Sequence, residues 1–256
     1  MAYFNNGIWE KIILASQRLV MMRNLRTFRP RNQLRRWGRL MAFYFCLQGV
    51  AGSLFAQTGN LTGTIELPDK VAGKRVAVEK YTGKISGKVS PAPIPVAGVW
   101  LTQEGLTAPD NPPDVKVAQR GYQFAESLLV VPLKTKVFFP NEDSDYHNIY
   151  SLSKGNRFDI GRYLKDEQPT PFVIFKNTGL VRLNCEIHEH MQAHVLVVDS
   201  PYYTRTDGKG NFQFKNVPAG NYTLNAQIDK KNIWKSTVQI VGRKTEKVTL
   251  GKIHKQ

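Results

Sequence analysis

The chain has 256 residues, 41% of them hydrophobic and 11% aromatic, so it can bury one large core or two small ones. Its formal net charge of +16 raises the question of an acidic partner such as nucleic acid. Residues 1–56 hold nine of the 36 basic residues and one of the 20 acidic residues, which leaves 27 basic against 19 acidic residues, a net charge of +8, beyond them. That remainder contains no basic run and no stripe of arginine and aromatic residues, which argues against nucleic-acid binding.

Residues 1–56 have the features of an export signal. An arginine-rich segment from Arg23 to Arg39 precedes LMAFYFCLQGVAGSLFA, 17 uncharged residues that end in a small one, Ala56. We expect cleavage after Ala56 and a periplasmic or secreted protein, with an uncleaved membrane anchor as the alternative. Since Cys46 lies in this leader, the mature chain keeps one cysteine, Cys185, and can form no internal disulfide.

Beyond residue 57 the sequence predicts an all-β protein. Gly, Pro, Asn or Asp interrupts the chain every 6 to 12 residues, and the runs between them are rich in Val, Ile, Phe, Tyr and Thr. No segment shows a helical period of useful length. The predicted strands are 60–67, 74–81, 96–103, 115–124, 128–133, 136–141, 147–152, 170–175, 180–185 and 193–199.

The segment 203–227, YTRTDGKGNFQFKNVPAGNYTLNAQ, predicts two paired strands with Asp207-Gly208 in a hairpin position. Residues 206–224 follow the pattern T-D-x-x-G-x-F-x-F-x-x-V-P-x-G-x-Y-x-L. In this they resemble the carboxypeptidase-regulatory-like family, whose fold is a small immunoglobulin-like β-sandwich. The family's two opening strands resemble GTIEL at 63–67 and PVAGVWL at 95–101, which lie far upstream.

This separation predicts a discontinuous domain. We expect residues 58–106 and 201–252 to form one sandwich, with residues 107–200 inserted between its halves. Strands within 60–67 and 96–103 should then pair with strands of 203–250. In the rival arrangement three units follow one another, and 58–106 packs on the middle unit as extra strands.

The stretch LNCEIHEHMQAHVL, residues 183–196, predicts a metal site. Apolar and polar residues alternate up to Cys185, so a strand would direct the thiol into the core. The spacing C-x-x-H-x-x-M can bring Cys185, His188 and Met191 to one point, and His147 follows the turn-rich PNEDSDY. Two imidazoles and a thiolate in one plane with a weak axial thioether are the ligand set of blue-copper electron-transfer sites.

Residues 115–200 resemble a cupredoxin of the amicyanin and plastocyanin-like branch, in the motifs LLVVPLKTKVFFPNED, HNIYS and CEIHEHM. The resemblance implies a Greek-key β-sandwich or barrel that holds one type 1 copper ion. It implies that His147, Cys185 and His188 are the strong ligands and Met191 the axial one. It also implies that Asn148 ties the His147 loop to the cysteine loop. With its regulatory-like tail, the chain is similar to methylamine-utilisation-type proteins, a name that fixes no activity.

Other polar residues surround these candidates. His190 and His194 fall on the opposite face of the return strand, and we expect them to be spectators. The acidic residues of the two metal loops are expected to be solvated charges, although one of them could replace Met191 as an axial carboxylate ligand. They are Glu142, Asp143, Asp145, Glu186 and Glu189.

The sequence therefore predicts an exported copper protein that carries single electrons between redox partner proteins, with an exposed edge of His188 as the exit. An enzyme is disfavoured, because a multicopper oxidase needs several His-x-His pairs and a binuclear centre needs a second cysteine. The chain offers one such pair, His188-Glu189-His190. The alternative is a non-redox envelope module that binds a glycan or a protein and keeps a metal for stability. Membrane contact is expected only through a retained leader.

Overall fold

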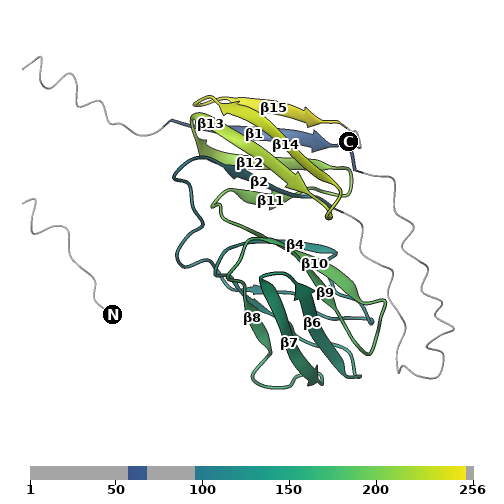
Figure 1. Cartoon of the computed structure of the whole chain (residues 1–256). Helices are drawn as coiled ribbons and strands as arrows, with labels where there is room; N and C mark the ends of the chain where they lie inside the picture. Colours follow the sequence, from purple (N-terminus) through teal and green to yellow (C-terminus); the bar gives the residue numbers. More distant parts are fainter. Residues whose placement is uncertain (1–56, 68–95, 252–256) are drawn as a thin grey trace, which may run out of the picture. The chain divides into compact units, whose positions relative to one another are not determined.

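The computed structural model describes residues 57–67 and 96–251. These residues form fifteen β-strands and no helix, so this part of the chain is all-β, and it offers no helix that could cross a membrane (Figure 1). The predicted leader and the predicted strand 74–81 lie outside the described residues.

Two of the four sheets combine strands from the two ends of the described chain (Figure 1). The first has the order β12-β1-β15, in which β1 runs antiparallel to β12 and parallel to β15. The second has the order β11-β2-β13-β14, in which β2 is antiparallel to both neighbours. The strands are β1 (Thr58–Ile65), β2 (Gly98–Thr102), β11 (Tyr203–Arg205), β12 (Asn211–Pro218), β13 (Gly220–Gln227), β14 (Ile233–Ile240) and β15 (Thr245–Leu250).

Both upstream strands thus form ladders with strands beyond residue 203, as the regulatory-like pattern led us to expect. Alternating apolar residues explain why these sheets pack together, because every second side chain of a strand points to the same face. Leu61 and Ile65 of β1, and Val99 and Leu101 of β2, are buried in one core with residues of β12 to β15. Whether these ranges constitute one domain interrupted by another stays a prediction.

The expected hairpin at Asp207-Gly208 is wrong. β11 pairs with β2 and β12 pairs with β1, so the strands on either side of this turn belong to different sheets. Asp207 closes the turn by accepting hydrogen bonds from the amides of Lys209 and Asn211, at 2.8 and 2.9 Å. The turn therefore carries the chain from the edge of one sheet to the edge of the other.

The two remaining sheets come from the middle of the chain. Their orders are β4-β10-β9-β6-β7 and β3-β5-β8, and buried residues such as Val131, Phe139, Ile149, Val181 and Val195 form their common core. The strands are β3 (Val115–Lys116), β4 (Leu128–Pro132), β5 (Lys136–Phe138), β6 (His147–Ser153), β7 (Asn156–Tyr163), β8 (Phe172–Ile174), β9 (Gly179–Asn184) and β10 (Gln192–Val198).

Two strand predictions in this region are wrong. Only Val115–Lys116 of the predicted strand 115–124 forms a strand, and Gly121 and Tyr122 turn the chain inside the predicted range with left-handed φ angles of 62° and 58°. β7 was not predicted, because it lies at the edge of its sheet and half of its residues are exposed, which weakens the apolar alternation.

The cores meet where β4 and β10 lie against β2 and β11. Leu128, Val130, Leu196 and Val198 form a buried cluster against which Trp100 and other apolar residues of the outer strands pack. β10 is therefore buried on both faces, unlike a strand with one face in water.

Gly210 offers a test of the pairing between β1 and the turn before β12. Its φ is 86°, and a Cβ placed on it would lie 1.9 Å from the carbonyl oxygen of Ile65. Gly105 also has a left-handed φ, 75°, but has open space around it. We expect Gly105→Ala to lower the free energy of unfolding by about 1–2 kcal/mol through φ alone. Gly210→Ala should cost about 2 kcal/mol more, because backbone atoms cannot move aside. Denaturant unfolding measures both, and equal losses would contradict this pairing.

Candidate metal centre

His147, Cys185 and His188 come together in the folded chain. His147 is the first residue of β6, whereas Cys185 follows β9 directly and His188 lies in the loop before β10. The ligand atoms of the three residues all lie within 4.8 Å of one another. The two Nδ1 atoms of the histidines are 3.1 Å apart, and the sulfur of Cys185 lies 3.8 Å from Nδ1 of His188. The convergence expected from the sequence is confirmed for these three residues.

The alternation of β9 explains the position of the thiol. Val181, Leu183 and Cys185 are 0, 1 and 2% exposed, whereas Arg182 between them is exposed. The strand thus directs the sulfur into the core, as predicted. His147 and His188 are 0 and 3% exposed, so three polar side chains share a site that is almost closed to water.

The thiol is held in an environment that favours the thiolate. Burial raises the pKa of Cys185, but hydrogen bonds from His147 and His188 and from the backbone amides of Asn148 and His188 outweigh it. The net effect lowers the pKa from 9.0 to about 5. A cysteine of this kind is a thiolate at neutral pH, and the thiolate is the form that binds metals.

Asp143 contacts His147, and the sequence did not predict this contact. Its Oδ2 lies 2.8 Å from Nε2 of His147, the nitrogen that points away from the other two ligand atoms. Burial lowers the pKa of His147. The hydrogen bonds to Cys185 and Asp143 and the negative charges of these two residues raise it, so that the pKa of His147 lies above its ordinary value. The expectation that Asp143 is a solvated loop charge is therefore wrong, since its side chain is 11% exposed. The position of Asp143, four residues before His147, was the feature of the sequence that could have indicated this contact.

Asn148 links the two metal loops, as the resemblance implied. Its Oδ1 accepts a hydrogen bond of 2.8 Å from the amide of Glu186, next to the cysteine. Its Nδ2 donates one of 2.9 Å to Asp159 of β7. Because Asn148 also follows His147 in β6, it fixes the spacing between β6 and the cysteine loop.

Met191 lies at the other end of the cysteine loop. It is fully buried in the same cluster as Cys185, and its amide donates a hydrogen bond of 2.8 Å to the carbonyl of His188. The loop therefore forms a tight turn between His188 and Met191. No carboxylate of the described residues joins the group of three ligand atoms, which argues against an acidic residue in place of Met191.

The remaining acidic residues and histidines have other contacts. Glu142 pairs with Arg120 and Glu186 pairs with Arg162, and neither His190 nor His194 belongs to the metal-binding group. His190 is not inert, because its Nε2 donates a hydrogen bond of 2.9 Å to the carbonyl of Tyr122. Since His188 is 3% exposed, the open edge expected there is nearly closed.

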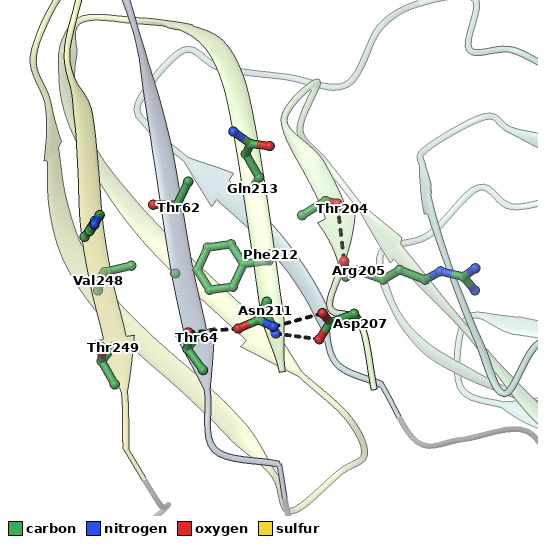
Figure 2. A pocket seen from close by; sticks show the side chains of 12 residues that line it. Thr62, Thr64, Thr204, Arg205, Asp207, Asn211, Phe212, Gln213, Val248 and Thr249 are labelled. Carbon is green, nitrogen blue, oxygen red and sulfur yellow. Dashed lines mark hydrogen bonds between the residues drawn. The ribbon is translucent and has the colours of Figure 1, made fainter. Parts of the chain in front are cut away.

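Two surface cavities lie in the described part of the chain. One, of about 930 Å³, opens beside Cys185 and reaches from Tyr150 and Asn184 to the turn at Asp229. The other, of about 710 Å³, lies over the sheet β12-β1-β15, and Figure 2 shows Asn211 between Thr64 and Asp207. Its polar groups bind one another, since Thr64 donates to Asn211 and Asn211 to Asp207, at 3.2 and 2.9 Å.

The chain is similar to several solved structures at low sequence identity. No protein-family model and no curated protein matches the chain. A purple cupredoxin from Nitrosopumilus maritimus is 21% identical over 33% of this chain and 100% of that chain, with a TM-score of 0.30. Amicyanin from Paracoccus versutus is 19% identical over 39% and 97% of the two chains, with a TM-score of 0.31.

A copper-containing nitrite reductase from Thermus scotoductus is 17% identical over 53% of this chain and 28% of that chain, with a TM-score of 0.32. Similarity at this level does not establish a family or a function. The chemistry proposed below therefore depends on the side chains themselves.

The thiolate can be tested without metal. We expect the ultraviolet thiolate absorbance of the metal-free protein to rise with pH around a midpoint of about 5. Because the folded thiol has the lower pKa, its contribution to the free energy of unfolding grows from about pH 5 to pH 9 and is lost as the pH falls through 5. Cys185→Ser supplies the blank, and His188→Ala should raise the midpoint. A midpoint at about 8.5, that of free cysteine, would show that the thiol lacks these hydrogen bonds.

Proposed function

We propose that the protein is an exported carrier of single electrons whose copper ion is held by His147, Cys185 and His188. The observation that carries this proposal is the buried group of one thiolate and two imidazoles within 4.8 Å. Nitrogen and sulfur donors bonded at about 2.0 to 2.3 Å to one ion lie about 3 to 4 Å from each other. The separations of 3.1 and 3.8 Å fit that requirement.

The donor set favours copper. Two imidazoles and a thiolate suit copper, and bound copper would supply a one-electron exchange between Cu(I) and Cu(II). Met191 is proposed as the weak axial ligand, because it is buried at the end of the cysteine loop. Asn148 is proposed as the residue that keeps the two loops in register.

The protein's own contribution is to restrict the movement of these side chains and to shield them from water. His147 is anchored in a strand, Cys185 follows one and Met191 precedes one, and all are buried in a core of apolar side chains. Such packing resists movement, because protein cores are close-packed. A site whose ligands stay in place when the charge changes is suited to electron transfer rather than to substrate binding.

The setting of the proposed carrier follows from the sequence. The leader features of residues 1–56 favour the periplasm or the outside of the cell, and the electron would pass to and from partner proteins. We further propose that residues 58–106 and 201–252 form a regulatory-like sandwich around the copper domain, 107–200. The ladders from β1 and β2 to strands beyond residue 203 support this.

The alternative function is a non-redox envelope module with a structural metal. The visible absorption of the copper-loaded protein distinguishes it from the proposed electron carrier. Protein loaded with Cu(II) should absorb intensely in the visible range, because a thiolate–copper bond gives blue-copper sites their colour, and Cys185→Ser should be colourless. We expect the metal-free variant to stay folded, because apolar packing holds the strands, and to lose about 2–3 kcal/mol of unfolding free energy at pH 7 with the thiolate. His194→Ala serves as the matched control and should stay coloured, because His194 is outside the ligand group.

Absorption, EPR and circular dichroism spectra distinguish the two functions. A colourless copper-loaded wild type would contradict the redox proposal. Unfolding of metal-free Cys185→Ser at room temperature would instead assign the metal a structural role.

A further inference from the structure

We infer that Asp143 and the turn Gly121–Tyr122 form a positioning bracket that orients His147 and supports His188. The inference rests on the proposed function, because it concerns the orientation of two proposed copper ligands. The sequence suggested no positioning role for any of the three bracket residues, and none belongs to the group of His147, Cys185 and His188.

Asp143 is the centre of this bracket, because its carboxylate accepts three hydrogen bonds. Oδ2 accepts from Nε2 of His147 at 2.8 Å and from the amide of Tyr122 at 2.9 Å, and Oδ1 accepts from the amide of Gly121 at 2.6 Å. The backbone of Asp143 is fixed as well, since its amide donates to Oδ1 of Asn141 at 2.9 Å. A carboxylate only accepts hydrogen bonds, so Nε2 of His147 carries the proton and its Nδ1 faces the other ligand atoms.

Tyr122 is held in a backbone conformation that it would not adopt by itself. Its φ of 58° is uncommon for a residue with a side chain, and such conformations persist only where the surroundings enforce them. Two further hydrogen bonds and the burial of its ring fix the residue besides the bond to Asp143. Its hydroxyl donates to Asp145 at 2.6 Å, its carbonyl accepts from His190 at 2.9 Å, and its ring is 1% exposed.

The ring of Tyr122 lies edge-on to both imidazoles. Its centroid is 5.1 Å from that of His188 at an interplanar angle of 77°, and 5.8 Å from that of His147 at 74°. These are favourable edge-to-face contacts. Asp143 thus orients His147 directly and, through the turn, keeps Tyr122 against both rings.

The bracket has a consequence for the metal that the ligand set alone does not give. A carboxylate bonded to the far nitrogen of a ligand histidine makes that ligand more basic. Its negative charge also stabilises the more highly charged Cu(II) over Cu(I). Asp143 should therefore lower the reduction potential and keep the two imidazoles in one arrangement.

The test replaces Asp143 by Asn in the full chain. Asparagine has one acceptor oxygen where three N–H groups converge, so its own NH₂ group must face at least one of them. We expect the affinity ratio of Cu(II) to Cu(I) to fall at least tenfold, a rise in potential of 59 mV or more for a one-electron couple. In the metal-free protein, the amides of Gly121 and Tyr122 should exchange with solvent at least tenfold faster than in wild type.

Glu142→Gln is the matched control, because it removes the same charge at the neighbouring position, where the carboxylate pairs with Arg120 instead. It should change both measurements less than threefold. The inference is overturned if Asp143→Asn behaves like this control, or if amide exchange accelerates while the potential stays unchanged.

Should circular dichroism show that Asp143→Asn does not fold, Asp143→Glu replaces it. That variant keeps the charge but displaces the carboxylate, so it should accelerate exchange and alter the Cu(II) EPR spectrum, and no change in either overturns the inference.

A wild-type protein without thiolate–copper absorption contradicts the proposed function and not the bracket. In that case amide exchange in metal-free wild type, Asp143→Asn and Glu142→Gln still decides whether Asp143 holds the turn. Equal exchange rates of the Gly121 and Tyr122 amides in all three proteins would overturn the inference.

Discussion

A buried thiolate next to two imidazoles is the constraint on which the rest of the structure depends. Cys185 is 2% exposed, and an unpaired charge at that depth would be costly. Burial raises the pKa of Cys185, but hydrogen bonds from His147, His188 and the backbone outweigh it and lower the pKa to about 5. The strands therefore have to deliver these groups together, and β6, β9 and β10 do so from two separate parts of the chain. The polar residues around the thiol are the means by which a charged group is tolerated in an apolar core.

Most of this arrangement could be predicted from local pattern. Alternation in β9 places Cys185 inward, and the spacing to His188 fits one tight loop, so both follow from a few neighbouring residues. His147 required an assumption about a second loop, which the turn-rich sequence before it supported. The ladders of β1 and β2 were predictable from the resemblance, because its missing opening strands had to lie upstream.

The parts that could not be predicted depend on tertiary contacts. Tyr122 has a left-handed φ because Asp143 binds its amide, and no local propensity indicates such a partner. The role of Asp143 was missed for the same reason, since an acidic residue in a polar loop has the same composition whether or not it binds a histidine. The strand β7 has too few buried positions to be distinguished from a loop by its sequence. The sequence around Asp207 is typical of a hairpin, and only the pairing of β11 with β2 shows that it is not one.

The strands of the two middle sheets lie between β2 and β11 in the chain, and β2 and β11 pair with each other. Trp100 lies opposite Tyr203 in their ladder, so the chain leaves and returns at adjacent points, where an insertion disturbs the surrounding sheet least. Buried hydroxyl groups fix this junction. Ser200 donates to the carbonyl of Leu101 at 2.6 Å, and Thr206 accepts from the amide of Ala97 at 2.9 Å. β10 also packs Leu196 and Val198 into a cluster with Trp100 and Tyr203 of the same two strands, so apolar contacts and buried hydrogen bonds act together at this junction.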